Sequence, residues 1–347
     1  MLQPSSLPLS VRSVEWLRTN HGAWLVNTVE RYWFTWHTPK PGGPTLTRLP
    51  SVGSPAATRA AAVPSWRPPS IRPVISPSLP GEGTWRATGA HVAGAPPVLV
   101  TTFRSEADYP RIVAYVAWID QTRTRLALYP GRYEPPGAAP RGPMDVPVGE
   151  RSRLLATFNS GFTYSDGQGG FSVDGRTATP LRDGEGTVVA YRNGKVDVIS
   201  WQGGATPGPT VVLARQNLPL IVVGGRPSAL LEQGRNWGDT LGNAVRVWRS
   251  GVGVDRRGNL IYAAADLQTV NTLASILIRA GAVRAIELDI NPEWPSFITY
   301  GRSGVRDPVK LVPNDQQPAG RYLVPDDRDF FAVYRRLPRT SALVPFQ

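Results

Sequence analysis

The chain has 347 residues, and 41% of them are hydrophobic, which is enough for one large domain or two ordinary domains with a substantial core. It contains no cysteine and only three histidines, so disulfides and thiol catalysis are excluded, and neither a Ser-His-Asp triad nor a histidine-rich zinc site is expected. The formal net charge of +12 comes almost entirely from arginines scattered along the chain, so we expect anionic partners in general but no nucleic acid.

Residues 1–38 are predicted to form an amphipathic helical segment. Their apolar residues recur at helical spacing, and Asn20-His21-Gly22 is the expected break between two short helices. The segment is rich in tryptophan, so it is predicted either to associate with a membrane or the cell wall or to dock on the main domain. No apolar run reaches the ~18 residues of a spanning helix, and the N-terminus lacks the basic-then-apolar layout of a signal peptide.

Residues 39–84 are rich in Pro, Ser, Ala and Gly, and they include Pro68-Pro69 and many isolated prolines. Because proline removes a backbone donor and interrupts helices and ladders, this segment is predicted to be an extended linker. The remainder, residues 85–340, shows no second shift of this kind and is expected to form one domain.

Short β-rich runs dominate the predicted domain. Residues 98–103, 112–119 and 125–129 are rich in β-branched and aromatic residues and are separated by turn residues, so they are predicted to be strands. Asn193-Gly194 between two further runs predicts a hairpin, because this pair accepts the positive φ angles of a type I′ turn. Residues 248–264 form a second predicted hairpin.

One helix is predicted in the domain, over residues 269–280, where apolar residues recur at helical spacing and Gly281 provides a C-terminal stop. The alternation that follows predicts a strand over residues 284–290. The pattern therefore predicts an α+β fold. It is a single domain built on a mostly antiparallel β-sheet with few helices, preceded by the N-terminal helical segment and the proline-rich linker.

Two carboxylates in this last strand are the first candidate chemistry. Alternation places Glu287 and Asp289 on one face, ~6–7 Å apart by the strand rise. Acids at this distance perturb each other's pKa when a cleft shields them from water, so the pair predicts an active site. The alternative is that both acids face solvent or form ion pairs with arginines.

Three further segments place polar residues in or at the ends of strands. Asn159 begins the small polar turn Asn159-Ser160-Gly161-Phe162, where nearby glycines could let a ligand approach the backbone. Arg249 and Ser250 lie among small residues of a strand, where the arginine is predicted either to bind a phosphate or to form a structural ion pair. Asp266 ends the next strand and is either a cap or a ligand, for instance of a calcium-type ion.

The order of these segments resembles the phosphodiester glycosidase family. The matching features are Asn-Ser-Gly-Phe at 159–162, the strand 249–255, a strand ending in Asp266, and a helix end that continues into Asp289. The resemblance implies cleft roles for Asn159, Arg249, Asp266 and Asp289. It also places Ser250 where the family has Thr or Ser.

The resemblance covers roughly residues 85–337 and is specific over 156–180 and 245–300. The main departure follows Asp289, where residues 290–294 read Ile-Asn-Pro-Glu-Trp instead of a glycine-rich turn. Proline and tryptophan build a stiffer and bulkier wall than glycines would. The departure is compatible with a different substrate, with a rearranged pair of acids, or with a cleft that binds without hydrolysis.

The resemblance implies hydrolysis of a sugar-1-phosphodiester linkage in a cell-envelope or exported glycoconjugate. The expected catalytic acids are Asp289, Glu287 and Asp266, and the expected substrate contacts are Asn159, Arg249, Ser250, Asn291 and Trp294. The partner would be a carbohydrate or sugar phosphate, and no cofactor or metal is assigned, although a calcium-type ion is compatible with the acids. The expected location is the cell envelope or another extracytoplasmic site, with the cytoplasm as the alternative.

A different class of function is also compatible with the sequence, namely a non-catalytic envelope protein that binds an anionic glycopolymer through the same cleft. In that case Trp294, Phe297 and Tyr300 would form a platform on which sugars stack, unless these rings simply pack in the core.

Overall fold

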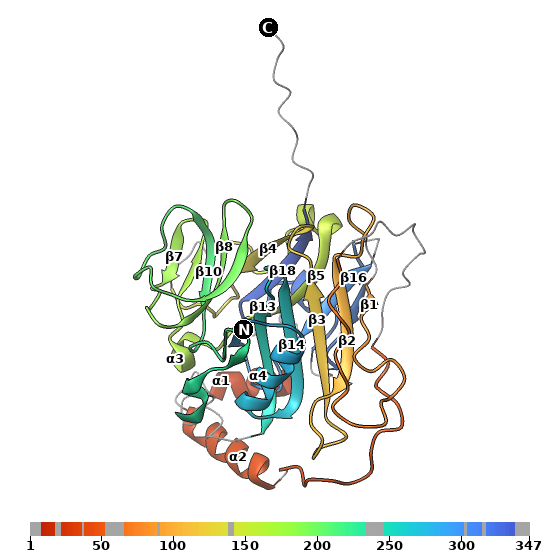
Figure 1. Cartoon of the computed structure of the whole chain (residues 1–347). Helices are drawn as coiled ribbons and strands as arrows, with labels where there is room; N and C mark the ends of the chain where they lie inside the picture. The colour runs from red at the N-terminus through yellow and green to blue at the C-terminus, as the bar shows by residue number, and fades with distance from the viewer. Residues whose placement is uncertain are drawn as a thin grey trace.

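The part of the chain that the structure describes contains three antiparallel β-sheets, and two N-terminal helices lie beside them (Figure 1). The computed structural model describes residues 8–17, 22–36, 38–52, 66–88, 91–137, 142–233, 237, 246–301, 304–313 and 317–336. The predicted fold class, mostly antiparallel sheet with few helices, is confirmed. Asn20 and His21 of the expected helix break lie outside the described residues.

The largest sheet has eight strands, in the order β1 (Arg86–Ala87), β2 (Val98–Arg104), β3 (Val113–Ile119), β14 (Leu260–Gln268), β13 (Val247–Val254), β15 (Arg284–Glu287), β11 (Val222–Val223) and β12 (Arg226–Pro227). A five-stranded sheet has the order β7 (Arg176–Thr179), β6 (Phe171–Val173), β10 (Val211–Gln216), β8 (Gly186–Tyr191) and β9 (Val196–Ser200). The other five-stranded sheet has the order β17 (Gly304–Lys310), β16 (Phe297–Gly301), β5 (Leu154–Asn159), β18 (Phe330–Arg335) and β4 (Thr124–Tyr129).

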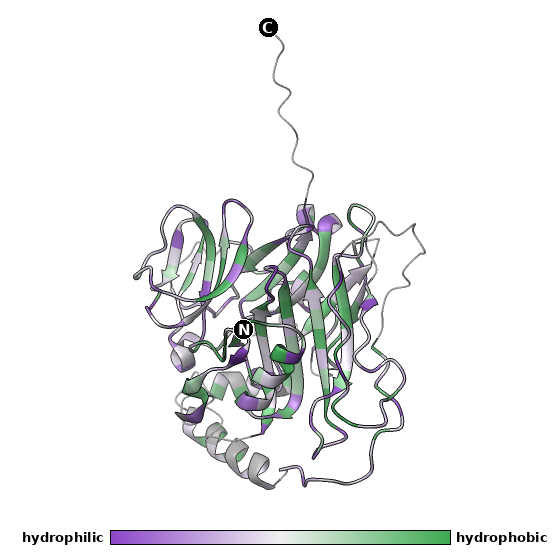
Figure 2. Ribbon diagram, in the orientation of Figure 1, coloured by the Kyte–Doolittle hydropathy of each residue, from purple (hydrophilic) through white to green (hydrophobic). Residues whose placement is uncertain are grey.

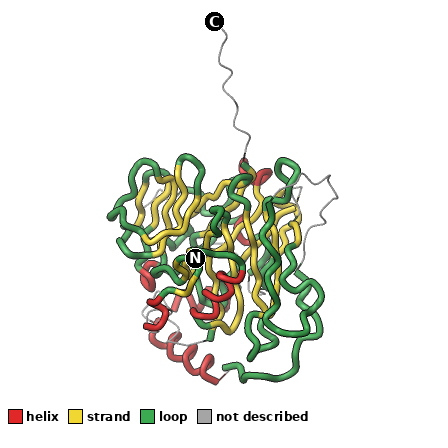
Figure 3. Tube along the Cα trace, viewed as in Figure 1, coloured by secondary structure: helices red, strands yellow, loops and turns green. Residues whose placement is uncertain are grey.

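The α-helices are α1 (Leu9–Leu17), α2 (Ala23–Trp36), α3 (Tyr164–Gly167) and α4 (Val270–Arg279), and short 3₁₀ helices cover Val148–Arg153, Ala229–Gln233 and Arg321–Leu323. Figure 3 shows α1 and α2 at one side of the molecule, outside the sheets. Within the described part of the chain, no helix has the length and apolar character needed to cross a membrane.

The main core lies between the largest sheet and the two smaller sheets. It joins Val252 of β13, Phe158 of β5 and Val188 of β8, so side chains from all three sheets share one apolar cluster. Apolar residues run along most of these strands (Figure 2). The opposite face of the largest sheet is covered by α4, whose Leu273 and Leu277 are fully buried there. The layered arrangement therefore buries the central strands on both faces.

The helix predicted over residues 269–280 is confirmed as α4, and its start has a clear local cause. Thr269 and Thr272 form a capping box, in which each side chain accepts a hydrogen bond from the backbone N–H of the other. The helix can lie close to β13 because Gly251 has no side chain. A Cβ there would meet Leu277 Cδ1 at 3.0 Å and the Ile286 carbonyl oxygen at 2.8 Å.

The acidic strand is shorter than its sequence predicts. Alternation suggested a strand over 284–290, but β15 ends at Glu287. Two residues later, the backbone N–H of Asp289 donates to the carbonyl oxygen of Ser160, in the turn after β5 (3.1 Å), which belongs to a different sheet. The chain thus crosses from the largest sheet toward β5 at the point where the candidate acids lie.

Residues 66–84 of the proline-rich segment pack against the largest sheet. Ile71 belongs to the apolar cluster under α4, and its N–H donates to the Gly83 carbonyl oxygen (2.9 Å). Glu82 and Arg104 form a buried ion pair (2.8 Å), and the same guanidinium donates to the Pro77 carbonyl oxygen (2.8 Å). Burial alone would raise the pKa of Glu82, but the hydrogen bonds from Arg104 and Leu79 outweigh it and lower that pKa. This half of the segment is anchored to the domain.

The hairpin predicted at Asn193-Gly194 is confirmed as β8–β9, but its turn is not type I′. Only Gly194 has a positive φ (85°), while the Asn193 side chain accepts a hydrogen bond from the Lys195 N–H (2.9 Å). The Gly194 N–H donates to the Tyr191 carbonyl oxygen (2.8 Å). This is the pattern of a type I turn followed by a left-handed glycine.

We expect Gly194→Ala to lower the free energy of unfolding by about 1–2 kcal/mol, because alanine is strained at this φ and its Cβ would displace the Arg336 guanidinium. Chemical denaturation measures the change. Gly208→Ala is the matched control, since Gly208 has no positive φ and open space around its Cβ position. An equal loss in both variants would show that left-handed strain at Gly194 is not the cause.

Candidate active site

Asn159, the last residue of β5, joins the two sheets at the candidate site. Its Nδ2 donates to Ser250 Oγ (2.9 Å) and to the Ser160 carbonyl oxygen (3.0 Å). Its Oδ1 accepts from the Tyr262 hydroxyl (2.9 Å) and from the Ser296 N–H (3.0 Å). These bonds fix the orientation of the buried amide, so Asn159 acts as a rigid hub.

Asp289 lies directly beside this hub. Ser250 Oγ donates to the Asp289 carbonyl oxygen (2.7 Å), and the Asp289 carboxylate accepts from the Asn291 N–H (3.0 Å). The backbone N–H of Asp289 also donates to the Ser160 carbonyl oxygen. Four of the predicted site residues, Asn159, Ser250, Asp289 and Asn291, are therefore brought together by the structure.

Each of the two acids, Glu287 and Asp289, has its own arginine partner. Glu287 forms a buried ion pair with Arg249 of β13, whereas Asp289 forms one with Arg328, which lies just before β18. Both acids therefore form ion pairs with arginines, which is one of the alternatives predicted from the sequence. Burial raises the pKa of Glu287 and the nearby Asp289 adds to this, while Arg249 opposes it. The two carboxylates thus have different partners and different environments.

Arg249 is held by the protein itself. Its Nε donates to the Gln268 carbonyl oxygen (3.0 Å), both Nη atoms donate to the Trp237 carbonyl oxygen (3.2 Å), and Nη1 also contacts Glu287. The guanidinium lies beside Gly251 and β15, on the face that α4 covers. In this arrangement Arg249 holds Glu287, the end of β14 at Gln268 and the backbone of Trp237, and contact with a phosphodiester would require these bonds to break.

Asn291 and Trp294 build the turn that replaces the glycine-rich sequence. Asn291 Oδ1 accepts from the Glu293 N–H (3.1 Å), and the Asn291 carbonyl oxygen accepts from the Trp294 N–H (2.9 Å). Both bonds close the chain tightly after Asp289. The wall of the site is therefore formed by a fixed turn.

The sugar-stacking platform suggested by the sequence is not formed. Phe297 and Tyr300 are fully buried core residues, and Trp294 is only 1% exposed. Two guanidinium groups lie over the Trp294 ring, that of Arg321 at 4.7 Å and that of Arg328 at 4.9 Å from its centroid. Trp294 thus supports the arginine that pairs with Asp289.

Asp266 stands apart from this network. Among the described residues its carboxylate accepts one hydrogen bond, from the N–H of Leu267 (2.7 Å), whose φ is 53°. Burial raises the pKa of Asp266, and its charge contributes to raising the pKa of Tyr115 to about 12, an effect caused mainly by burial. No group of three or more His, Cys, Asp or Glu in the described ranges is placed to hold a metal ion.

The run Asp-Asp-Arg-Asp at 326–329 carries site residues that the sequence did not reveal. Four consecutive charged residues suggest a solvated loop, yet all four are buried. Their ion pairs are Arg321–Asp326 (2.6 Å), Arg132–Asp327 (3.2 Å), Arg328–Asp289 and Arg215–Asp329 (2.6 Å). The sequence feature that indicated burial of this run is the adjacent Phe330-Phe331. These two residues begin a core strand, so the charged residues directly before them are buried as well.

Several buried polar atoms near Asp289 have no hydrogen-bond partner among the described residues. They include Ser160 Oγ, Trp294 Nε1 and Glu287 Oε2. Ser160 bonds to Asp289 through its backbone, and Trp294 lies under the arginine that pairs with Asp289. Buried polar groups are normally satisfied, so Ser160 Oγ and Trp294 Nε1 are candidates for contact with an oxygen atom of a ligand.

Glu134 is a second acid near Arg328 that the sequence analysis missed. Its carboxylate accepts a hydrogen bond from the Tyr164 N–H (3.0 Å) at the start of α3. Burial raises the pKa of Glu134 and Asp329 adds to this, while Arg328 and Arg215 oppose it. An acid with a raised pKa beside the candidate site is itself a functional candidate.

We expect Glu134→Gln to be at least as stable as the unchanged protein at neutral pH. Because the folded state binds the Glu134 proton more tightly, this residue makes stability fall as pH rises from about 4.5 through its raised pKa. Glutamine keeps an acceptor for Tyr164 and cannot ionise. Unfolding free energies of both proteins at pH 4.5 and pH 7.5 measure the difference, which should move in favour of the variant at the higher pH.

If the unfolding free energy of the variant instead fell relative to that of the unchanged protein at the higher pH, Arg328 would require an ionised Glu134. If activity falls while stability rises, the carboxyl group is retained for function, since such trade-offs are typical of active sites.

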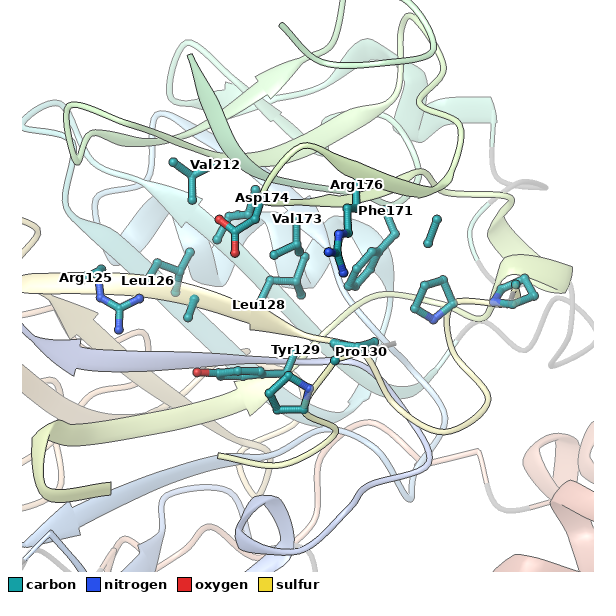
Figure 4. A pocket seen from close by; sticks show the side chains of 18 residues that line it. Arg125, Leu126, Leu128, Tyr129, Pro130, Phe171, Val173, Asp174, Arg176 and Val212 are labelled. Atoms are coloured by element: carbon teal, nitrogen blue, oxygen red, sulfur yellow. The ribbon is translucent and has the colours of Figure 1, made fainter. Parts of the chain in front are cut away.

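A cavity of about 520 Å³ lies elsewhere in the molecule, between β4 and the sheet that contains β6, β7 and β10 (Figure 4). Leu126, Leu128 and Val173 line it, together with Arg125 and Arg176. None of the candidate residues is part of its lining. The candidate site is therefore defined by converging polar groups and not by this cavity.

Residues 152–289 match the model of the phosphodiester glycosidase family, so the resemblance drawn from the sequence motifs is confirmed. The matched range includes Asn159, Arg249, Asp266, Glu287 and Asp289. It ends before Arg328. The match supports a glycosidase-type function for this part of the chain.

Two solved structures are similar to this chain. One is the catalytic domain of zebrafish N-acetylglucosamine-1-phosphodiester alpha-N-acetylglucosaminidase, auto-inhibited by its pro-peptide, with 16% identity, a TM-score of 0.45, and coverage of 73% of this chain and 88% of that chain. The other is a hypothetical protein from Synechocystis, with 12% identity, a TM-score of 0.41, and coverage of 72% of this chain and 65% of that chain. No curated protein matches the chain.

Proposed function

We propose that the protein hydrolyses a sugar-1-phosphodiester, cleaving the bond between the anomeric carbon and the phosphate oxygen. The observation that carries this proposal is the buried pair of Asp289 and Arg328, which the Asn159–Ser250 network holds at the end of the family-matched region. An acid and an arginine in contact supply the two charges that this reaction needs.

In this proposal Asp289 attacks the anomeric carbon or activates the water that does so. Arg328 offsets the negative charge of the departing phosphate monoester, which leaves readily and needs little help from a general acid. Ser250 bonds to the main chain of Asp289 and Asn159 bonds to Ser250, so these residues aim the carboxylate. Arg249 and Glu287 act as positioning residues behind the site, and Asp266, which stands apart from this network, is assigned no role in the reaction.

The cellular substrate in this proposal is a cell-envelope or exported glycoconjugate that carries a sugar-1-phosphodiester. The absence of cysteine and the excess of positive charge fit a protein that meets anionic polymers outside the cytoplasm. Fractionation of cells that make the native protein tests the location. Recovery of the full-length product only in the cytosol would contradict it.

The reaction is tested with nucleotide sugars and p-nitrophenyl sugar-1-phosphodiesters, compared with plain p-nitrophenyl glycosides that lack phosphate. We expect free sugar together with a nucleoside diphosphate from the nucleotide sugars and with p-nitrophenyl phosphate from the phosphodiesters. Turnover of the plain glycosides should be at least about 100-fold lower, because Arg328 then has no phosphate to stabilise. Tight binding of a glycopolymer with no turnover of any phosphodiester would instead favour the non-catalytic binding function.

A further inference from the structure

The exposed face of α2 is unusually aromatic. Trp24, Tyr32, Trp33 and Trp36 are exposed by 70%, 66%, 60% and 84%. Single exposed apolar residues are normal on protein surfaces, but four large aromatic side chains within one 14-residue helix form a continuous patch. Such a patch marks an interaction surface.

Helical geometry places these aromatic side chains together. At about 100° per residue, residues 24, 25, 28, 29, 32, 33, 35 and 36 fall within one half of the helix circumference. Leu25 and Val29 are exposed there as well, and the two threonine positions, 28 and 35, are the polar positions of this half. The positions of the two charged residues, Glu30 and Arg31, fall on the other half. The aromatic half thus contains no charged position.

The side by which α2 packs against the rest of the protein includes Val26. Val26, which lies outside the aromatic half, is buried, and α2 contacts α1. The exposed side chains Leu9 and Trp16 of α1 extend the apolar surface. Figure 3 shows both helices outside the sheets, at one side of the molecule. The site described above, at the ends of β5 and β15, is built from other elements.

We propose that this aromatic face inserts into the interfacial layer of an anionic lipid bilayer. Tryptophan and tyrosine have an apolar body and a polar tip, and they favour the headgroup boundary over both water and the hydrocarbon interior. A helix of 14 residues lies in the plane of this boundary because it is too short to span a bilayer. The formal net charge of +12 favours anionic headgroups.

The proposal is tested by co-sedimentation of the full chain with phosphatidylglycerol-containing vesicles at low and physiological salt. We expect the triple variant Trp24→Ser, Trp33→Ser and Trp36→Ser to lower the partition coefficient at least about tenfold. Trp66→Ser is the matched control, because Trp66 is 42% exposed and packs beside Trp118 and under Arg257 in the main domain. It should bind vesicles as the unchanged protein does.

Quenching of tryptophan fluorescence by brominated lipids provides a second measurement, and it should be strong for the unchanged protein and weak for the triple variant. Circular dichroism melting of each variant shows that the domain is still folded. Failure of the unchanged protein to bind the vesicles would overturn the proposal. It would also be overturned if the triple variant converted a stable dimer to a monomer without a change in vesicle binding, because the face would then cover a second copy of the chain.

Discussion

Replacing Asp289 with asparagine is expected to lower kcat for a sugar-1-phosphodiester by at least about 10³-fold, because the amide can neither attack the anomeric carbon nor activate water. Asparagine has nearly the same shape and keeps an acceptor for the Asn291 N–H. It leaves Arg328 without its carboxylate partner, so we also expect a stability loss of about 3 kcal/mol. Steady-state kinetics and chemical denaturation measure the two effects separately.

Glu82→Gln is the matched control for this experiment. Glu82 and Arg104 form another buried ion pair, between residues that have no part in the candidate site, so the variant should lose a similar amount of stability while the folded protein keeps its kcat. If Asp289→Asn loses stability but retains activity below its melting temperature, the Asp289 carboxylate is structural. The binding function would then be the better account of the cleft.

Substitution of Arg249, the partner of Glu287, is expected to have the second large effect, and this effect is mainly on stability. Arg249→Met leaves a fully buried carboxylate without its ion-pair partner and should lower the free energy of unfolding by about 3–5 kcal/mol. Arg249→Lys should also be damaging, because one ammonium group cannot bond to Gln268, Trp237 and Glu287 together.

The double variant Arg249→Met with Glu287→Leu distinguishes a positioning role of these two residues from a direct role in the reaction. Replacing both charges of a buried pair with apolar side chains is often nearly neutral, so most of the stability should return. We expect most of the activity to return with it, since both residues act from behind the site. A double variant that is folded and inactive would show that Glu287 takes part in the reaction itself.

Local features of this fold could be predicted from sequence. The spacing of apolar residues and the Thr269 cap define α4, and Gly194 locates the β8–β9 hairpin, because both depend on interactions within a few residues. The turn type at Asn193 was predicted incorrectly. Asn193 itself does not have a positive φ, since its side chain bonds to the backbone of Lys195 and a left-handed conformation is needed only at Gly194.

The candidate site could be predicted only in part. Asn159, Ser250 and Asp289 follow motif order and do meet in space. Arg328 is 39 residues from Asp289, and nothing in a short window of sequence indicates which arginine a buried acid will pair with. The end of β15 at Glu287 was missed for the same reason, because the Asp289 N–H bonds to a residue 129 positions earlier, Ser160. Long-range pairing, not local propensity, determines both features.

The most direct test of the proposed function is hydrolysis of a sugar-1-phosphodiester in ¹⁸O-labelled water. Cleavage at the anomeric carbon breaks the bond between that carbon and the phosphate oxygen, so the account predicts ¹⁸O on carbon 1 of the released sugar and none in the phosphate monoester. Mass spectrometry of both products measures the label. Label in the phosphate would show attack at phosphorus, and it would contradict a glycosidase reaction at Asp289.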